Sequence, residues 1–302
     1  MSWGESLEAA DVSLGPIAGR VLAVVNQKGG VGKTTTAVNL AASLAASERA
    51  TLLIDLDPQA NASSAFGIGA GAPRAIGRPA LQIYDVLSGA CSALEAAQPT
   101  ELSHLHVIPA GEDLSGAEIE LVEAEDRQAR LRRAIEPALP LYDYILIDCP
   151  PSLGLLTLNA LVAATAVLIP LQGEYYALEG LARLQRTIER IRAAFHPSLE
   201  IEGIVLTMFD RRSNLSRQVE EEVRSHFGAG VFRSMIPRNM RLSEAPSHGK
   251  PILLYDIQSR GATAYLELAQ ELLERHPRPQ RKPPQLPVPG PDAAASGEES
   301  AS

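Results

Sequence analysis

Residues 27–36 of this 302-residue chain read Gln-Lys-Gly-Gly-Val-Gly-Lys-Thr-Thr-Thr. The triplet Gly-Lys-Thr at 32–34 matches the end of the phosphate-binding pattern G-x-x-x-x-G-K-[ST], whereas Gln27 stands where that pattern begins with glycine. The apolar residues 21–25 before the loop predict a buried strand, and residues 34–46 after it carry apolar side chains at helical spacing. In this context backbone N–H groups and a helix N-terminus converge on phosphate oxygens. The stretch therefore predicts a nucleotide-binding α/β fold.

Each part of the loop has an expected contact. Lys33 should reach the β- and γ-phosphates, and the Thr34 hydroxyl should bind Mg²⁺. Backbone amides should line the phosphates, because glycines let the chain approach them closely. The alternative is a strand–helix turn that merely favours glycine. The predicted nucleotide contacts in the loop are Lys28, Gly29, Gly30, Val31, Gly32, Lys33, Thr34 and Thr35.

Lys28 is a second lysine inside the loop and departs from the common pattern. The sequence K-G-G-x-G-K-T-T resembles the deviant Walker A family, which includes the ParA/Soj partition ATPases, the MinD division-site ATPases and the nitrogenase iron protein. This resemblance implies ATP and Mg²⁺ as cofactors, and a nucleotide-sandwich homodimer in which Lys28 touches the partner's phosphates. A cation supplied in trans to the γ-phosphoryl group is worth roughly 10³–10⁵ in rate. Lys28 and Lys33 are therefore predicted to be catalytic, and the open alternative for Lys28 is a solvated loop lysine.

Two acidic motifs end apolar runs that read as strands, where ligands of open α/β sheets gather. The run Asp-Leu-Asp-Pro-Gln at 55–59 resembles the family's D-x-D-P-Q switch, which implies that Asp57 orients the attacking water and is catalytic. A pair of carboxylates that faces solvent is the alternative. The run Asp-Cys-Pro-Pro-Ser at 148–152 has the form of a Walker B strand end followed by a second switch, and its aspartate should hold Mg²⁺ through water. The predicted metal-binding residues are Thr34, Asp55 and Asp148.

Only the resemblance indicates which residues contact the adenine base. The family places its base pocket where two strands end, here at residues 207–208 and 236–239. The resemblance implies that Met208, Pro237 and Asn239 contact the base. Without the resemblance, a proline directly after a strand would usually mark only the end of that strand.

Strand and helix patterns alternate along the chain, which predicts a doubly wound, mostly parallel sheet in the α/β class. The strands are expected at 21–26, 51–55, 104–109, 144–148, 166–171, 201–207 and 231–236. Helices are expected at 34–46, 114–122, 127–138, 155–164, 177–195, 215–227 and 262–275. One domain should span 19–275, between an N-terminal tail at 1–18 and a proline-rich, disordered or extended tail at 276–302.

Composition narrows the function classes. Hydrophobic residues make up 45% of the chain, which supports a core, and the two cysteines, Cys91 and Cys149, are too few for a disulfide framework. No basic start with an apolar core precedes residue 20, so no secretory signal is expected. The uncharged stretch 149–173 has the length of a membrane span, but prolines, glycine and asparagine interrupt it. It reads as buried core, and no membrane partner is expected.

The last third of the chain resembles chromosomal ParA/Soj sequences at 210–215 and at 237–252, which includes Leu-Ser-Glu-Ala-Pro-Ser-His-Gly. The resemblance implies sequence-independent binding of double-stranded DNA through Arg212 and Arg241, with Lys250 and Arg260 as weaker candidates. The whole chain carries a formal charge of −9, yet residues 204–262 contain nine Lys/Arg against six Asp/Glu. DNA binding needs a local basic patch and not a positive total. The alternative is that these arginines form surface ion pairs.

The predicted function is therefore a DNA-binding ATPase for chromosome or plasmid partitioning, nucleoid-associated in the cytoplasm. It should form an ATP-dependent homodimer and be stimulated by a ParB-like protein. A MinD-type function requires an amphipathic helix at the C-terminus, where this sequence is proline-rich and polar. A nitrogenase-type function requires paired cysteines for a cluster, and Cys91 and Cys149 do not form such a pair. The rival is a cargo-positioning or regulatory scaffold ATPase of the same fold that does not use nucleoid DNA.

Overall fold

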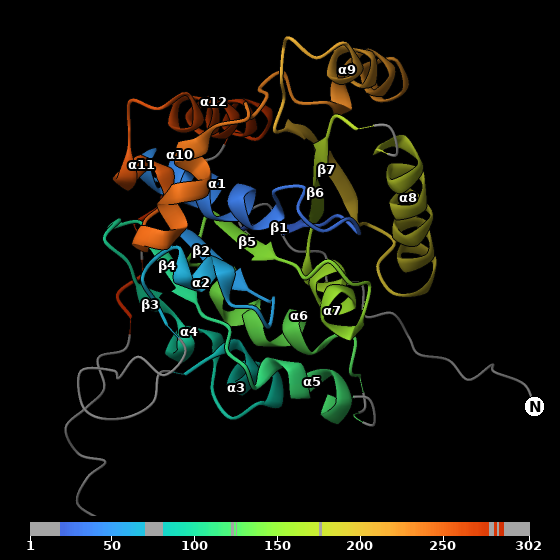
Figure 1. The fold of residues 1–302 in the computed structure, drawn as a ribbon. Coiled ribbons are helices and arrows are strands. Elements are labelled where there is room, and N and C mark those ends of the chain that lie inside the picture. Colours follow the sequence, from blue (N-terminus) through green and yellow to red (C-terminus); the bar gives the residue numbers. More distant parts are fainter. Residues whose placement is uncertain are drawn as a thin grey trace, which may run out of the picture.

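The computed structural model describes residues 19–69, 81–121, 124, 126–174, 177–277, 281–282 and 284–286. Within these residues, strands form a seven-stranded sheet in the order β3-β4-β2-β5-β1-β6-β7 (Figure 1). Neighbouring strands are parallel except β3, which pairs antiparallel with β4. The predicted doubly wound, mostly parallel sheet is confirmed. The strands are β1 (Arg20–Val24), β2 (Thr51–Asp55), β3 (Gln98–Pro99), β4 (Leu105–Ile108), β5 (Tyr144–Asp148), β6 (Ala166–Gln172) and β7 (Glu200–Thr207).

Helices cover both faces of the sheet and enclose two apolar cores (Figure 1). The first face carries α1 (Lys33–Ala46), α2 (Asn61–Ser64), α10 (Met240–Glu244), α11 (Ile252–Tyr255) and α12 (Arg260–Arg275). The second face carries α3 (Ile83–Ser88), α4 (Ala93–Ala96), α5 (Leu114–Glu120), α6 (Arg130–Ile135), α7 (Leu155–Ala163), α8 (Ala177–Ala194) and α9 (Asn214–Phe227). Every residue of β1, β2, β4 and β5 is buried, as parallel strands between two helix layers require.

Strand register positions the carboxyl ends that form the site. Asp55, the last residue of β2, is the partner of Asp148, the last residue of β5. Val24, the last residue of β1, also pairs with Asp148 on the other side of β5. The loop from β1 to α1 therefore leaves the sheet beside both aspartates.

Two predicted elements are wrong in extent. Residues 231–236 do not form a strand: Val231 makes one isolated bridge, to Ile204 of β7, and the next bridge, between Phe209 and Pro237, lies beyond this range. The backbone N–H groups of Arg233 and Ser234 donate to the Glu271 carboxylate instead of to a neighbouring strand. The helix predicted at 127–138 is α6 followed by a 3₁₀ turn, Glu136–Ala138, because Pro137 lacks the N–H that would continue an α-helix.

The predicted C-terminal tail contains residues that contact the domain. The Arg281 guanidinium Nη1 donates to the carbonyl oxygens of Leu139, Pro140 and Tyr142 at 3.2, 2.9 and 3.0 Å. The Leu286 side chain packs against the second-face core. The domain boundary predicted at 275 therefore falls short of these contacts, whereas the predicted tail at 1–18 lies outside the described residues.

A membrane span was not expected from the sequence. Among the residues that the structure describes, no helix combines the length and the apolar character needed to cross a bilayer.

Candidate nucleotide site and arginine groove

The loop between β1 and α1 has the backbone shape that phosphate binding needs. Gly30 and Gly32 have φ of 74° and 85°, a left-handed conformation that side-chain-bearing residues rarely adopt. No atom lies within 4 Å of a Cβ built at Gly29 or Gly30, so this part of the loop faces open space. Residues Gly29 to Gly32 thus form an open backbone cradle at the N-terminus of α1, which favours a bound anion.

Lys33 lies inside this cradle. Its side chain is buried, and its Nζ donates to the Lys28 carbonyl at 3.2 Å. Burial lowers the pKa of Lys33, and the charges of Asp148 and Asp57 oppose that shift. An ammonium with a single hydrogen bond to a neutral carbonyl can readily exchange it for a phosphate oxygen, which is a stronger, charged acceptor.

Asp148 is fully buried, and within the described part of the chain neither of its carboxylate oxygens has a hydrogen-bond partner. Burial, followed by the Asp55 charge, holds the pKa of Asp148 well above its usual range, while the nearby Thr34 hydroxyl and the Lys33 ammonium act in the opposite direction. A buried carboxylate without donors is unfavourable unless a cation or ordered water satisfies it. Oxygen donors from a carboxylate and a threonine suit Mg²⁺, so Asp148 and Thr34 fit this ion.

Asp55 is held by protein donors instead. Its Oδ2 accepts hydrogen bonds from the Ser63 backbone N at 2.8 Å and from the Ser63 hydroxyl at 2.7 Å. Its Oδ1 accepts from the Asp57 backbone N at 3.2 Å. Burial raises the pKa of Asp55 to about 6. These bonds indicate that Asp55 orients the segment after β2, and Ser63 is a contributor that no sequence pattern singled out.

Asp57 follows Asp55 by two residues, and its carboxylate accepts fewer hydrogen bonds than that of Asp55. Its side chain is mostly buried, and Oδ1 accepts one hydrogen bond, from the Gln59 backbone N at 3.0 Å. Its charge reaches both Lys33 and Asp148, since it contributes to the pKa of each. A carboxylate at this place, with acceptor capacity remaining, could orient a water molecule next to a γ-phosphate.

The predicted base contacts come together on the other side of the loop. The Thr207 hydroxyl donates to the Val31 carbonyl at 2.8 Å, which ties the end of β7 to the phosphate loop. Met208 has φ of 49°, a strained conformation for a residue with a side chain. The next residue, Phe209, pairs with Pro237, and Asn239 caps α10 through its Oδ1. The segment after β7 thus adjoins the phosphate loop and pairs with Pro237, whereas contacts of Met208, Pro237 and Asn239 with a base stay a prediction.

The Lys28 side chain is paired with a residue outside the phosphate loop. Its Nζ forms an ion pair with Glu174, just beyond the end of β6, and about half of its side chain is exposed. Its backbone N donates to the Asn26 side chain at 3.0 Å, and Asn26 in turn donates to the Pro170 carbonyl at 2.8 Å. The lysine is thus half exposed and held by one ion pair, and Glu174 is a contact that the sequence did not indicate.

A second hollow, which we call the arginine groove, lies beside the base side of the site. Its cavity volume is about 810 Å³, between the segment after β7 and α12. Two carboxylates, Asp210 and Glu267, also line it. The four arginines that line the groove are Arg211, Arg212, Arg238 and Arg260.

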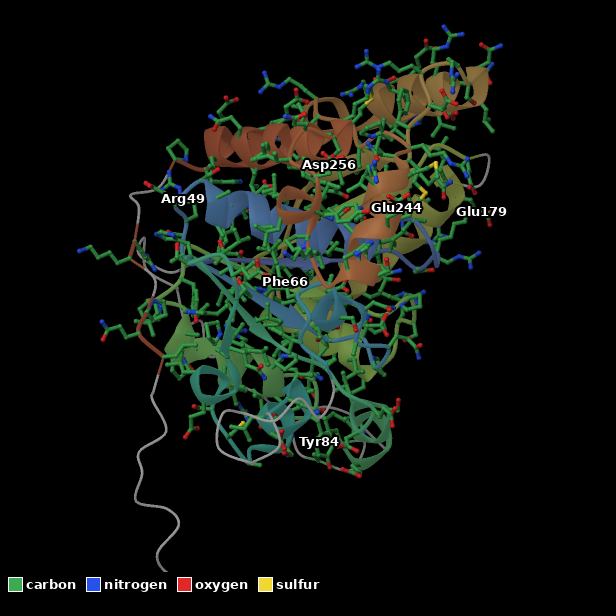
Figure 2. All side chains as sticks on the ribbon, turned by 60° about the vertical axis from the view of Figure 1, so that its left-hand side comes forward. Arg49, Phe66, Tyr84, Glu179, Glu244 and Asp256 are labelled. Carbon is green, nitrogen blue, oxygen red and sulfur yellow. The ribbon has the colours of Figure 1, made fainter. Side chains whose placement is uncertain are left out.

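The predicted DNA-binding residues separate into two groups. Arg212 and Arg260 line the arginine groove together with Arg211 and Arg238, which the sequence analysis missed although Arg211 adjoins Arg212. Arg241 instead pairs with Glu244, three residues on in the same helix α10, at 3.0 Å and with Asp256, directly after α11, at 3.5 Å. Figure 2 labels both acids. Lys250 pairs with Glu101 at 3.7 Å and is not part of the groove. Arg212 and Arg260 therefore line the groove, whereas Arg241 and Lys250 are not among its lining residues, and DNA contacts of all four stay a prediction.

Comparisons with known proteins identify the family. A family model described as an AAA domain matches residues 19–201. The chain is 57% identical over 257 residues to the chromosome partitioning protein ParA of Myxococcus xanthus, which covers 85% of this chain and 89% of that protein. It is 52% identical over 254 residues to the sporulation initiation inhibitor protein Soj of Bacillus subtilis, which covers 84% of this chain and 98% of that protein. This chain belongs to the ParA/Soj family.

ParA/Soj membership confirms the predicted family and, with it, a chromosome-partitioning ATPase. A crystal structure of cobyrinic acid a,c-diamide synthase from Mycobacterium smegmatis, with bound ATP analog and magnesium, matches the fold with a TM-score of 0.72. Its identity is 35%, over 87% of this chain and 99% of that chain. The ligands in that structure agree with the predicted cofactors, ATP and Mg²⁺. The activity in its name does not outweigh the partition proteins, because their identity to this chain is much higher.

Proposed function

We propose that this ParA/Soj ATPase is a switch that dimerises when it binds ATP, and that the dimer binds DNA without sequence preference. Hydrolysis, stimulated by a ParB-like partner, returns it to the monomer and releases the DNA. The observation that carries this proposal is Lys28, whose half-exposed side chain pairs with Glu174, a residue outside the phosphate loop. A lysine so placed is suited to reach a second copy of the chain.

In the proposed nucleotide complex, Gly29 to Gly32 donate backbone hydrogen bonds to the phosphates, and Lys33 exchanges its carbonyl partner for a phosphate oxygen. Mg²⁺ would neutralise charge on the β- and γ-phosphates. The residues that would hold it are Thr34 and Asp148. Among the described residues, the carboxylate oxygens of Asp148 have no hydrogen-bond donor. Asp55 keeps the segment after β2 in place through Ser63. Met208, Pro237 and Asn239 would contact the adenine.

For hydrolysis, Asp57 would orient a water for in-line attack on the γ-phosphorus. The water oxygen forms the new bond to phosphorus, the bond to the β–γ bridging oxygen breaks, and ADP and phosphate leave. Lys33 in cis and Lys28 from the partner would stabilise charge on the transferring group. Such reactions depend mostly on positioning and electrostatics, so intrinsic turnover of the isolated chain should be slow until a partner completes the arrangement.

DNA binding is proposed for the arginine groove together with Arg241. A single groove with four arginines and two acids binds a polyphosphate weakly, but a dimer presents two grooves to one duplex. Each phosphate neutralised contributes about 0.9 to the slope of log K against log salt concentration, so dimerisation raises affinity steeply. This links ATP to DNA binding and would place the ATP-bound protein on the nucleoid.

The deciding experiment compares binding of a random-sequence DNA duplex with ATP, with ADP and without nucleotide. The proposal expects tight binding only with ATP, and a salt slope that reflects several phosphates. Asp57→Ala should bind ATP and DNA but release no phosphate, so its DNA complex should persist. Equal DNA binding in all three nucleotide states would refute the switch. ATP-dependent dimerisation without any DNA binding would favour the scaffold ATPase.

A further inference from the structure

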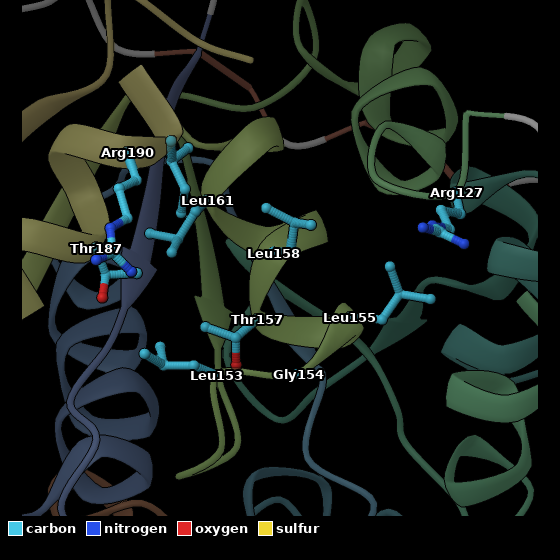
Figure 3. A pocket seen from close by; sticks show the side chains of 10 residues that line it. Arg127, Leu153, Gly154, Leu155, Thr157, Leu158, Leu161, Thr187 and Arg190 are labelled. Carbon is cyan, nitrogen blue, oxygen red and sulfur yellow. The ribbon is translucent and has the colours of Figure 1, made fainter. Parts of the chain in front are cut away.

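A further cavity, distinct from the nucleotide site and the arginine groove, lies between α7 and α8. Its volume is about 430 Å³, and we call it the leucine groove because Leu153, Leu155, Leu158 and Leu161 line it (Figure 3). The last three recur every third residue along α7 and so follow one side of that helix. Leu155 and Leu158 are only partly buried, and the Leu153 side chain is 42% exposed. The groove therefore offers apolar surface that a further apolar segment could cover.

Positive charge flanks this apolar surface. Arg190 on α8 and Arg127 before α6 lie on opposite sides of the leucines (Figure 3). Both residues are exposed, and neither is part of the nucleotide site or the arginine groove. A segment that fits the leucine groove should thus carry apolar side chains on one side and carboxylates at its margins.

The first 18 residues of the same chain have this chemistry in their sequence. Trp3, Leu7, Ala10 and Leu14 follow one another at intervals of four, three and four residues, the spacing of one helical face. The segment also contains Glu5, Glu8 and Asp11, and it has no lysine or arginine. Gly15 and Pro16 then mark a break before the domain. The matched family region begins at residue 19, so this pattern lies outside it.

The attachment point of this segment lies near the leucine groove. Gly19 donates to the Leu139 carbonyl at 2.9 Å, and the Thr165 backbone N donates to the Val21 carbonyl at 2.8 Å. Thr165 follows α7 almost directly, and Leu161 in the groove is only four residues before it. Eighteen residues reach up to about 60 Å when extended, and twelve helical residues span about 18 Å, so the chain easily covers the distance.

We propose that residues 3–14 dock in the leucine groove of their own chain. Trp3, Leu7 and Leu14 cover the leucines of α7, and the acidic residues lie toward Arg127 and Arg190. Docking in cis is favoured over docking on a second copy, because the short tether gives an effective concentration of about millimolar. The docked segment also covers Leu153, which lies between Asp148 and α7, and so connects the N-terminus with the segment that leaves the nucleotide site.

The test uses Trp3, the one tryptophan of the chain, as a built-in probe. In the full-length, nucleotide-free protein we expect blue-shifted Trp3 emission and protection from acrylamide, both lost in a synthetic peptide of residues 1–18. Leu153→Glu and Arg190→Glu should each remove the protection. Arg186→Glu, a charge reversal on the same helix at a residue that does not line the groove, is the matched control and should keep it.

A variant with substitutions in residues 3–14 controls for the possibility that the groove substitutions unfold the domain. Leu7→Asp combined with Leu14→Asp leaves residues 19–286 unchanged and should expose Trp3 while the thermal unfolding of the domain persists. Quenching of wild-type Trp3 equal to that of the peptide would overturn the proposal. Protection that survives both Arg190→Glu and Leu153→Glu would place the segment elsewhere. Protection that rises with protein concentration would assign it to a second copy and refute docking in cis.

Discussion

Lys28 and Glu174 form an ion pair that joins the phosphate loop to the segment after β6. Both side chains are close to half exposed, and an exposed pair of this kind contributes only about 0–1 kcal/mol to stability. The lysine is therefore held in a defined place by an interaction weak enough to be exchanged. A partner's γ-phosphate, with more charge, would be the stronger acceptor.

The first prediction concerns this exchange. Lys28→Ala should bind ATP as a monomer but fail to dimerise, because the trans contact to the partner's phosphates is lost. Light scattering with a non-hydrolysable ATP analogue and Mg²⁺ measures the change. Glu174→Gln is the control: it removes the cis partner but keeps the lysine, so the dimer should persist. A Lys28→Ala protein that still doubles its mass with the analogue would exclude the trans role.

Asp148 gives a prediction in which stability and ligand binding change in opposite directions. Asp148→Asn removes a buried carboxylate that lacks donors, so the nucleotide-free chain should gain on the order of 1–3 kcal/mol in unfolding free energy. The same change should abolish the additional stabilisation by ATP with Mg²⁺, which amounts to about 2.7 kcal/mol at a hundredfold excess over Kd. Thermal melts with and without ATP and Mg²⁺ measure both effects. If the variant melts lower without ligand and still responds to Mg²⁺, Asp148 is not the metal residue.

The arginine groove can be tested by charge reversal. Arg238→Glu and Arg212→Glu should each weaken binding of the ATP-bound dimer to duplex DNA, and each should reduce the salt slope by about 0.9 or more. Arg241→Glu should also weaken it, although Arg241 must first leave Glu244 and Asp256. Gel shifts at several salt concentrations, with dimerisation checked in parallel, give the answer. Lys250→Glu is the comparison: an effect as large as that of Arg238→Glu would show that the contact surface lies elsewhere.

His106 gives a pH-dependent prediction far from the nucleotide. Its Nδ1 lies 2.8 Å from the Tyr142 hydroxyl, and burial lowers the pKa of His106 to about 4. The unfolded chain then binds a proton more readily, so the histidine's contribution to stability is present above about 6.5 and is lost as pH falls toward 4. The unfolding free energy of the wild type minus that of His106→Gln should thus fall over this window by up to about 3 kcal/mol. Denaturant titrations at several pH values measure the difference, and a difference independent of pH would show that folding does not change the pKa of His106.

Sequence patterns were sufficient for the parts of the fold that depend on local composition. Apolar runs gave β1, β2 and β5, and the glycine-rich loop with its two lysines gave the phosphate cradle. The mostly parallel sheet followed from the alternation of strands and helices. These features depend on neighbouring residues, so a reading of the chain in order could find them.

Features that depend on tertiary contacts could not be predicted from the sequence. Residues 231–236 have strand composition, but Glu271 on α12 binds two of their backbone donors and interrupts the ladder. The hydrogen bond from Ser63 to Asp55 joins residues 8 positions apart, and the ion pair between Lys28 and Glu174 joins residues 146 positions apart. Arg211 and Arg238 gain their meaning only because the groove brings them beside Arg212 and Arg260. None of these contacts has a local signature.

The Arg281 guanidinium, held by three carbonyl oxygens between Leu139 and Tyr142, also has a practical consequence. It fastens the C-terminal segment under the starting ends of β1 and β5, at the pole opposite the phosphate loop. Shortened versions that stop at residue 275 would remove this donor from all three carbonyl groups, of which the Leu139 carbonyl would keep the hydrogen bond from the Gly19 N–H. Assays on such versions would then measure a weakened base of the sheet as well as a missing extension, so trimming should stop after Leu286.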